Sequence, residues 1–247
     1  MHLHSHRQLY VRLAVVLILV QLSPTSFAQS AATPSETRKT STPYTGDLAR
    51  FESPGRAERL QIDKVMDLLG IAAGKNVADI GAGSGWFTMQ AARRVGPQGA
   101  VFAVDINPKA TDYIAARAKK EKLGNVHVVL SQPDDPMLPR DAVDAVLLLK
   151  TYHEVAHPVI LLRNLRASLK PGARVGIIER NGNGEDHGID REVVIREATE
   201  AGYAVDQQLD WKKDGMDYFL ILWLAVESEK TGQHVASCPE VDTISEC

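Results

Sequence analysis

Cysteine is scarce in this chain of 247 residues, and its two cysteines, Cys238 and Cys247, both lie near the C-terminal end. The rest of the sequence can therefore form neither a disulfide nor a zinc site with cysteine ligands. An exported protein could pair the two with each other, and the sequence leaves that pairing open.

The sequence also has little in the way of long apolar runs. A transmembrane helix needs about 18 or more apolar residues, and the run Leu13–Val20 is far shorter. A segment with two arginines and no acid precedes this run, and Pro24 and the small-x-small pattern Ser26–Ala28 follow it. The order is typical of a secretory signal peptide over residues 1–28 and predicts an exported, periplasmic or secreted protein. An uncleaved anchor or a mis-assigned start is the alternative, and no stable membrane anchor is expected.

Neither sign of charge dominates, because the formal net charge is only −3. Nothing in the composition indicates a nucleic-acid partner or an anionic membrane surface. Residues 29–55 begin with a stretch rich in Ser, Thr, Ala and Pro and are predicted to be a linker or N-terminal extension. Residues 227–247 are predicted to be a flexible polar tail, which leaves 56–226 as a single domain.

Short apolar strands alternate with amphipathic helices inside that domain. Helices are predicted over 57–71, 86–96, 109–124, 157–172 and 190–203, with strands over 76–80, 100–106, 126–130, 143–149 and 174–179. Two final strands, 204–211 and 217–226, have no helix between them. The pattern predicts an α/β protein with a Rossmann-like, doubly wound, seven-stranded sheet, mostly parallel with an antiparallel hairpin at one edge.

A glycine-rich loop, Asp79–Trp86 with the sequence DIGAGSGW, follows the first strand. Ligands of such sheets bind beyond the carboxyl ends of the strands, and glycines let the backbone approach them closely. A dinucleotide-binding loop would have its third glycine where Trp86 stands, so pyrophosphate binding is disfavoured. A purely structural turn is the alternative interpretation.

The second strand ends at Asp105, whose carboxylate could accept hydrogen bonds from both ribose hydroxyls of an adenosine. Ile106 would then offer an apolar face to the adenine. Asp105 could instead cap the following helix, but Asn107 stands directly before Pro108 and suits that role better. Asp105 is therefore predicted to bind a ligand.

Five segments of the chain resemble the class I S-adenosylmethionine-dependent methyltransferases. These are VADIGAGSGWFT, VFAVDINP, LSQPDDPMLP, VDAVLLLKTYHEVAHP and LKPGARVGIIE, which run in the family's order from the first strand through the fifth. The resemblance looks closest to a bacterial group of predicted small methyltransferases with an N-terminal signal peptide. It implies S-adenosylmethionine as cofactor and a small-molecule methyl acceptor, and it leaves the oligomeric state open.

The resemblance also implies roles for individual residues. Asp79 would lie near the cofactor's ammonium, and Asp105 and Ile106 would hold the ribose and adenine. Either Gln132 or Asp134 would meet the adenine amine, with Asp134 preferred. The family layout further suggests that residues 44–56 cover the cofactor. The loop residues expected beneath the methionine part are Gly81, Ala82, Gly83 and Gly85.

The stretch His153–His157 reads H-E-x-x-H, the string of zinc peptidases. Such a site needs both histidines one turn apart on a helix. Pro158 predicts that the helix begins after the motif, so the two histidines need not share a face. His187 is a possible third ligand but lacks a recognised spacing. No metal site is predicted, and an exported zinc hydrolase or a non-catalytic nucleoside-binding protein stays as an alternative.

In a methyltransferase the same stretch would lie beside the acceptor. Tyr152, His153 and Glu154 are the catalytic candidates, with His153 as a general base oriented by Glu154. These side chains could instead only shape the pocket. His157, next to the helix proline, is predicted to be structural.

Overall fold

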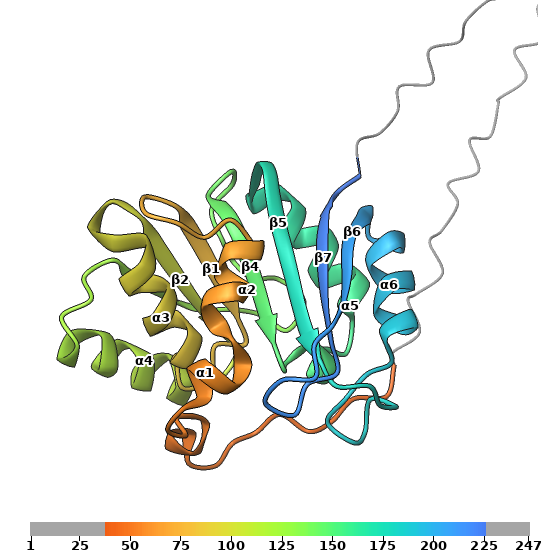
Figure 1. Ribbon diagram of the computed structural model, residues 1–247, viewed down its shortest axis with the longest axis horizontal. Coiled ribbons are helices and arrows are strands. Elements are labelled where there is room, and N and C mark those ends of the chain that lie inside the picture. Colours follow the sequence, from red (N-terminus) through yellow and green to blue (C-terminus); the bar gives the residue numbers. More distant parts are fainter. Residues whose placement is uncertain (1–37, 226–247) are drawn as a thin grey trace, which may run out of the picture. The chain divides into compact units, whose positions relative to one another are not determined.

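The computed structural model describes residues 38–225, and these contain one seven-stranded sheet with the order β3-β2-β1-β4-β5-β7-β6 (Figure 1). Strands β1 to β5 pair in parallel, and β7 runs antiparallel to both β5 and β6. The predicted fold class is confirmed, edge hairpin included. The strands are β1 (Asn76–Ile80), β2 (Ala100–Asp105), β3 (Val126–Leu130), β4 (Val143–Leu149), β5 (Leu169–Glu179), β6 (Tyr203–Asp210) and β7 (Tyr218–Leu224).

Helices cover both faces of this sheet (Figure 1). Helices α2, α3 and α4 pack on one face, where alternate strand residues such as Val77 and Val101 meet them. Helices α5 and α6 pack on the other face, against Ala78 and its neighbours. The bounds are α1 (Arg56–Leu60), α2 (Ile62–Leu68), α3 (Trp86–Val95), α4 (Pro108–Lys120), α5 (Pro158–Leu165) and α6 (Arg191–Glu200).

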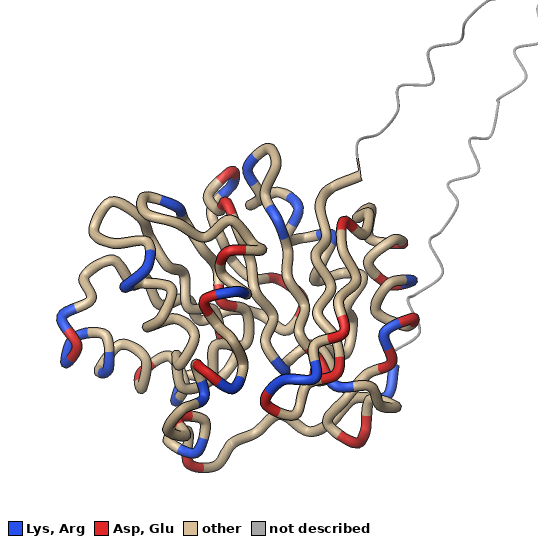
Figure 2. Tube along the Cα trace, viewed as in Figure 1, with Lys and Arg blue, Asp and Glu red and all other residues tan. Residues whose placement is uncertain are grey.

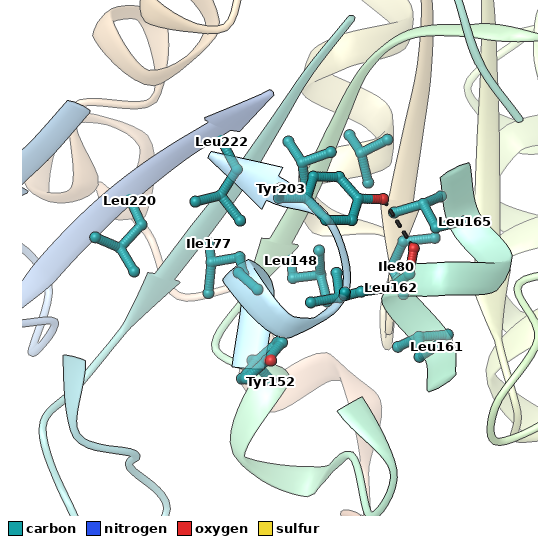
Figure 3. Close-up of a cluster of buried hydrophobic side chains, with 14 of the residues drawn as sticks. Ile80, Leu148, Tyr152, Leu161, Leu162, Leu165, Ile177, Tyr203, Leu220 and Leu222 are labelled. Carbon is teal, nitrogen blue, oxygen red and sulfur yellow. Dashed lines mark hydrogen bonds between the residues drawn. The ribbon is translucent and has the colours of Figure 1, made fainter. Parts of the chain in front are cut away.

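The core beneath α5 and α6 is apolar with a few tyrosines whose hydroxyls are satisfied (Figure 3). Tyr203 is fully enclosed, and its Oη donates to the carbonyl oxygen of Leu162 at 2.9 Å. A buried hydroxyl without such a partner would cost free energy, so this bond fixes where β6 meets α5.

Along the described chain, basic and acidic residues are interspersed (Figure 2).

Two helix boundaries differ from the prediction. The single helix expected over 57–71 breaks at Gln61, which has a left-handed φ of 57°. The indole Nε1 of Trp211 donates to the Leu60 carbonyl at 3.1 Å and takes an acceptor that a continuous helix would use. The helix expected over 157–172 ends at Leu165, and Pro171 and Gly172 lie within β5, where its register to β4 shifts.

Residues 38–55, called here the N-terminal strap, contact the domain instead of forming a free linker. Arg38 forms an ion pair with Glu197 of α6 at 2.8 Å. Ser41 is only 3% exposed, and its Oγ donates to the Gly184 carbonyl at 2.7 Å. Of the two predicted possibilities, linker or N-terminal extension, residues 38–55 have the form of an extension, because hydrogen bonds and ion pairs hold them to the domain.

No helix among residues 38–225 has the length and apolar character needed to cross a membrane. The predicted signal peptide, residues 1–28, lies outside the described residues, as do Cys238, Cys247 and the predicted tail.

Candidate functional site

A cavity of about 500 Å³ lies beyond the carboxyl ends of β1, β2 and β4. Its walls come from the N-terminal strap, the glycine loop, the tip of β2, the loop after β3 and the turn after β4. Cofactor sites of proteins typically have volumes of about 300–1,000 Å³, and parallel sheets place them at this edge. The cavity is therefore the candidate site.

The glycine loop is held by the neighbouring strand. The amides of Gly81 and Ala82 both donate to the Val104 carbonyl, at 2.8 and 3.1 Å. Gly81 has a φ of 70°, and a Cβ there would lie 2.1 Å from Oγ1 of Thr151. Gly83 has no atom within 4 Å of the corresponding position. The loop thus brings bare backbone to the cavity wall, where Gly81, Ala82 and Gly83 all lie.

Gly85 has a different place from the one the resemblance implies, since it does not line the cavity. It caps the N-terminus of α3 with a φ of 70°, and a Cβ there would lie 3.0 Å from Ile114 of α4. Its lack of a side chain therefore serves the start of α3 and the close approach of α3 and α4.

Asp105 connects the tip of β2 to the glycine loop. Its Oδ2 accepts from the Gly83 amide and its Oδ1 from the Asn107 amide, both at 2.8 Å. Burial raises the pKa of Asp105. Each carboxylate oxygen keeps a second lone pair, so the group can still accept from a ligand. Asn107 Oδ1 accepts from the Lys109 amide at 3.0 Å, as its predicted N-cap role requires.

Ile106 lies in the cavity wall and is 46% exposed, unusual for a large aliphatic side chain. A ligand with a flat apolar face would cover it. Its neighbour Asp105 is only 9% exposed. The tip of β2 therefore presents an apolar and a charged side chain next to each other, as an adenosine would require.

Asp79 also lies in the cavity wall, where its Oδ2 accepts from Oγ1 of Thr88 at 2.6 Å. Burial raises the pKa of Asp79 to about 7, and the nearby carboxylate of Asp105 adds to this, while Thr88 and Arg56 act against it. Arg56 lies in the same wall, with its guanidinium 4.4 Å from the centre of the Trp86 ring. The site thus holds a buried acid and a half-buried cation in its wall.

Asp134, the residue preferred for adenine, does not line the cavity. Its carboxylate lies 3.1 Å from Nδ1 of His157, and its backbone oxygen accepts from Nδ2 of Asn164 at 2.7 Å. Gln132 and Pro133 line the cavity in its place. The preference for Asp134 is corrected because these contacts hold it against α5.

The H-E-x-x-H string does not form the peptidase arrangement. Its helix, α5, begins at Pro158 as predicted, and the residues Tyr152–Glu154 form a separate 3-10 turn. Nδ1 of His153 lies 2.9 Å from Glu179, whereas His157 faces Asp134. The two histidines therefore have different partners and do not act as a helical pair.

The short turn also separates the three catalytic candidates. Tyr152 is fully buried, its Oη donates to Glu197 at 2.9 Å, and burial raises its pKa well above the usual range. His153 is 2% exposed and likewise does not line the cavity. Their expected contact with the acceptor is corrected, because the turn directs both side chains into the protein.

Glu154 does line the cavity. Burial raises the pKa of this carboxyl to about 7, with a smaller opposing effect from His153. Its Oε1 lies 3.9 Å from Nε2 of His153. Of the three catalytic candidates, Glu154 is therefore the one that a bound acceptor could touch.

Several wall residues escaped the sequence-based prediction. Ser84 Oγ is buried at the wall and has no hydrogen-bond partner among residues 38–225. Arg56 carries no motif and belongs to residues 44–56, for which only the family layout suggests a place over the cofactor. This segment has no periodic pattern of its own from which its position could be predicted. The strap residues in the wall are Pro43, Tyr44, Thr45, Leu48 and Phe51.

Comparison with known proteins defines the class to which this fold and site correspond. Residues 77–172 match a family described as a methyltransferase domain. The match runs from β1 into β5 and includes the glycine loop and Asp105. Residues 77–172 are therefore similar to a methyltransferase domain, and the sheet of residues 38–225 has the Rossmann-like fold of S-adenosylmethionine-dependent methyltransferases.

Individual relatives agree with this class. The chain is 32% identical over 136 residues to the ubiquinone/menaquinone biosynthesis C-methyltransferase UbiE of Pseudomonas paraeruginosa, over 54% of this chain and 52% of the relative. It is 30% identical over 134 residues to the protein of the same name in Vibrio campbellii, again over 54% of this chain and 52% of the relative. The chain thus spans about half the length of the curated relatives it matches.

Solved structures share the fold. A SAM-dependent methyltransferase from Aquifex aeolicus superposes with a TM-score of 0.65 at 24% identity, over 72% of this chain and 98% of that one. Aeropyrum pernix fibrillarin, solved with natively bound S-adenosyl-L-methionine, gives a TM-score of 0.52 at 15% identity, over 67% and 73% of the two chains. At these identities the likeness concerns the arrangement of strands and helices.

Proposed function

We propose that this protein binds S-adenosylmethionine in the cavity and transfers its methyl group to a small, largely apolar acceptor. The main observation in support of the proposal is the hydrogen bond that the Gly83 amide donates to the carboxylate of Asp105. It joins the glycine loop to the tip of β2, so that a carboxylate and bare backbone face one cavity. Ile106 completes the adenosine end of that site.

The methionine end of the cofactor would meet Asp79, Ser84 and Arg56. The carboxylate of Asp79 would pair with the ammonium, and the guanidinium of Arg56 with the carboxylate. Ser84 Oγ is buried without a hydrogen-bond partner among the described residues 38–225 and lies just before α3, whose first amides favour an anion. A carboxylate placed there would satisfy this hydroxyl and so remove an energetic cost.

The adenine would lie on Ile106, with the loop Gln132–Pro133 at its edge. Both residues of this loop line the cavity. The protein's task in methyl transfer is alignment, because the sulfonium already activates the methyl group and the displacement is in line. Glu154, in the turn after β4, is a charged residue of the cavity wall that would contact the acceptor.

The acceptor side of the cavity is mostly apolar, with Leu48 and Phe51 from the strap and Val155 after β4. Such walls suit a small apolar molecule better than a highly charged one. The UbiE relatives are named as C-methyltransferases of quinone biosynthesis. Methylation of a carbon atom on a small acceptor is therefore the first reaction to test.

Calorimetry with the purified chain tests the cofactor directly. We expect S-adenosylmethionine and S-adenosylhomocysteine to bind with one molecule per chain, and NAD⁺ to bind at least about tenfold more weakly because Trp86 stands where a pyrophosphate loop needs glycine. Methyl transfer to a panel of quinols and phenols would then be followed by mass spectrometry. Absence of binding by both sulfur compounds would refute the proposal.

Cofactor affinity should depend on pH through Asp79. The ammonium of the cofactor needs the ionised carboxylate, and the pKa of Asp79 is raised to about 7 in the free protein. Affinity should therefore rise roughly tenfold from pH 5.5 to pH 7, since each unit below the pKa removes about 90% of the ionised form. Calorimetry across this range would measure it, and Asp79→Asn should bind weakly with a flatter profile. An identical slope in both proteins would contradict the role of Asp79.

The raised pKa of Asp79 should make the stability of the cofactor-free protein fall as the pH rises, whereas cofactor affinity should rise. Folding raises the pKa of Asp79, so the folded state holds a proton that the unfolded chain releases from about pH 4 upward. Its stabilising contribution is complete below the unfolded pKa and is lost as the pH rises through about 7. Chemical unfolding between pH 5 and pH 8 should show a smaller decline for Asp79→Asn.

Export remains a proposal supported by sequence alone, namely the predicted signal peptide of residues 1–28. Fractionation of cells that produce the untagged chain tests it, with a shortened periplasmic form as the expected result and a full-length cytosolic form as the contrary one.

A further inference from the structure

His153 is oriented by a carboxylate that is itself buried. Glu179 ends β5 with no exposed surface, and its oxygens lie 2.9 and 3.1 Å from Nδ1 of His153. The backbone amide of His153 donates to the same carboxylate at 3.3 Å. Because Nδ1 faces an acceptor it carries the proton, so in the neutral ring Nε2 has the free lone pair. This lone pair lies on the side of Glu154, whose Oε1 is 3.9 Å away.

His187, in the loop after β5, lies close to His153. Its φ of 60° is left-handed, a conformation that costs a non-glycine residue on the order of 1 kcal/mol. Ser41 of the N-terminal strap holds it there, because its Oγ accepts from the His187 amide at 2.9 Å and donates to Gly184. The ring of His187 stands edge-on to that of His153, with centroids 5.8 Å apart.

We propose that His153, Glu154 and His187 form a binding site for a divalent transition metal ion of the zinc type. One nitrogen or oxygen from each residue lies within 4.8 Å of the others. Ligands at 2.0–2.1 Å on a tetrahedral ion are about 3.3 Å apart, so small side-chain rotations close the site. Two imidazoles and one carboxylate suit zinc and leave a fourth position open.

The buried Glu179 supports a metal site independently of the three ligands. Histidines that bind metals almost always donate their second N–H to a carboxylate or carbonyl, which fixes the ring and makes it a better ligand. Glu179 has this position relative to His153. Burying a carboxylate within the sheet is costly unless it serves a charged or polar partner, and orienting a metal ligand provides one.

The metal site also suggests a chemical class of acceptor, and this part rests on the proposed function. Glu154 is the one of the three ligands that lines the cavity, so an ion held by its carboxylate would lie at the edge of the space left for the acceptor. A divalent ion there would bind an oxygen of the acceptor, such as a phenolate, enolate or carboxylate, and hold it against the methyl donor. The acceptor is then an oxygen-bearing compound and not a simple amine.

Zinc titration of the full chain, after chelator treatment and dialysis, tests the metal site. We compare wild type, His187→Ala and His157→Ala by competition with a fluorescent zinc chelator. His187 is exposed, so its replacement should not unfold the protein. The N-terminal histidines and the tail cysteines are the same in all three proteins, so differences in affinity report on the proposed site.

The expected result is one zinc site in wild type that is weakened roughly 100-fold or more in His187→Ala and changed less than about threefold in His157→Ala. Substitution with cobalt(II) should give the visible spectrum of a four-coordinate nitrogen and oxygen site in wild type and His157→Ala but not in His187→Ala. Equal affinity in wild type and His187→Ala would overturn the proposal. So would an equal loss in His157→Ala, which would indicate the peptidase arrangement.

Calorimetry with S-adenosylmethionine on the same variants separates this inference from the proposed function. His187→Ala should bind the cofactor with unchanged affinity, because its ring lies outside the cavity wall. Loss of zinc with retained cofactor binding is the expected combination. Retained zinc without any cofactor binding would leave the metal site standing and remove the methyltransferase proposal.

Discussion

Asp105→Ala should weaken the binding of S-adenosylmethionine by roughly 10- to 100-fold. The carboxylate would lose its bonds to the ribose hydroxyls, and hydrogen bonds to a charged group are worth about 1.5–3 kcal/mol. It would also release the Gly83 amide, which it holds at 2.8 Å. Both effects act on the same end of the cofactor. Calorimetry at constant pH and salt measures the change.

Asp112→Ala is the matched control, because Asp112 is an exposed acid on the neighbouring helix α4. It removes the same charge from the same region and should leave affinity within about twofold. Asp105→Asn adds a second comparison: its amide can accept from one backbone N–H but not from both, so affinity should lie between wild type and Asp105→Ala. Unchanged affinity in Asp105→Ala would contradict the ribose assignment.

Gly81→Ala should destabilise the protein by roughly 2–5 kcal/mol and remove cofactor binding. The new Cβ would lie 2.1 Å from Thr151 Oγ1, at a φ of 70°. The left-handed backbone costs a residue with a side chain about 1–2 kcal/mol, and forced overpacking costs about 1–3 kcal/mol more. Denaturant unfolding measures the loss of stability.

Gly83→Ala separates these two costs. Gly83 has a φ of 55°, but a Cβ there would meet nothing within 4 Å. Its destabilisation should be limited to the backbone contribution of about 1–2 kcal/mol. Thr151→Ala combined with Gly81→Ala should recover part of the difference, since it removes the nearest atom. Equal destabilisation by Gly81→Ala and Gly83→Ala would show that the contact with Thr151 is unimportant.

The positions of the strands and their mostly parallel arrangement could be predicted because short apolar runs alternate with amphipathic helices along the sequence. The glycine loop and Asp105 were likewise identifiable, since both stand at strand ends, where their side chains and amides must face the same edge. Asn107 beside Pro108 marked the start of α4 for the same local reason. Such features depend on residues adjacent in the sequence, so the sequence alone is enough to predict them.

The remaining features depend on contacts between distant segments. Nothing in the sequence shows that Ile114 packs against Gly85. A three-residue 3-10 turn has no periodic signal that gives the direction of its side chains, so the burial of Tyr152 and His153 cannot be seen in the sequence. The contact of Asp134 with His157, which keeps it out of the cavity wall, is equally invisible there. In each case a partner far along the chain decided the position.

The N-terminal strap is anchored at both of its ends. Arg38 pairs with Glu197 of α6 at 2.8 Å, and Glu52 accepts from Arg117 of α4 at 2.6 Å. These two helices lie on opposite faces of the sheet. The strap residues between Arg38 and Glu52 therefore form a cover across the carboxyl edge of the sheet (Figure 1). A polypeptide that begins after residue 55 would keep the glycine loop and every strand of the sheet and lose that cover. Bulk water would then reach the sulfonium, and the trimmed enzyme would lack the enclosure that directs its methyl group to the acceptor.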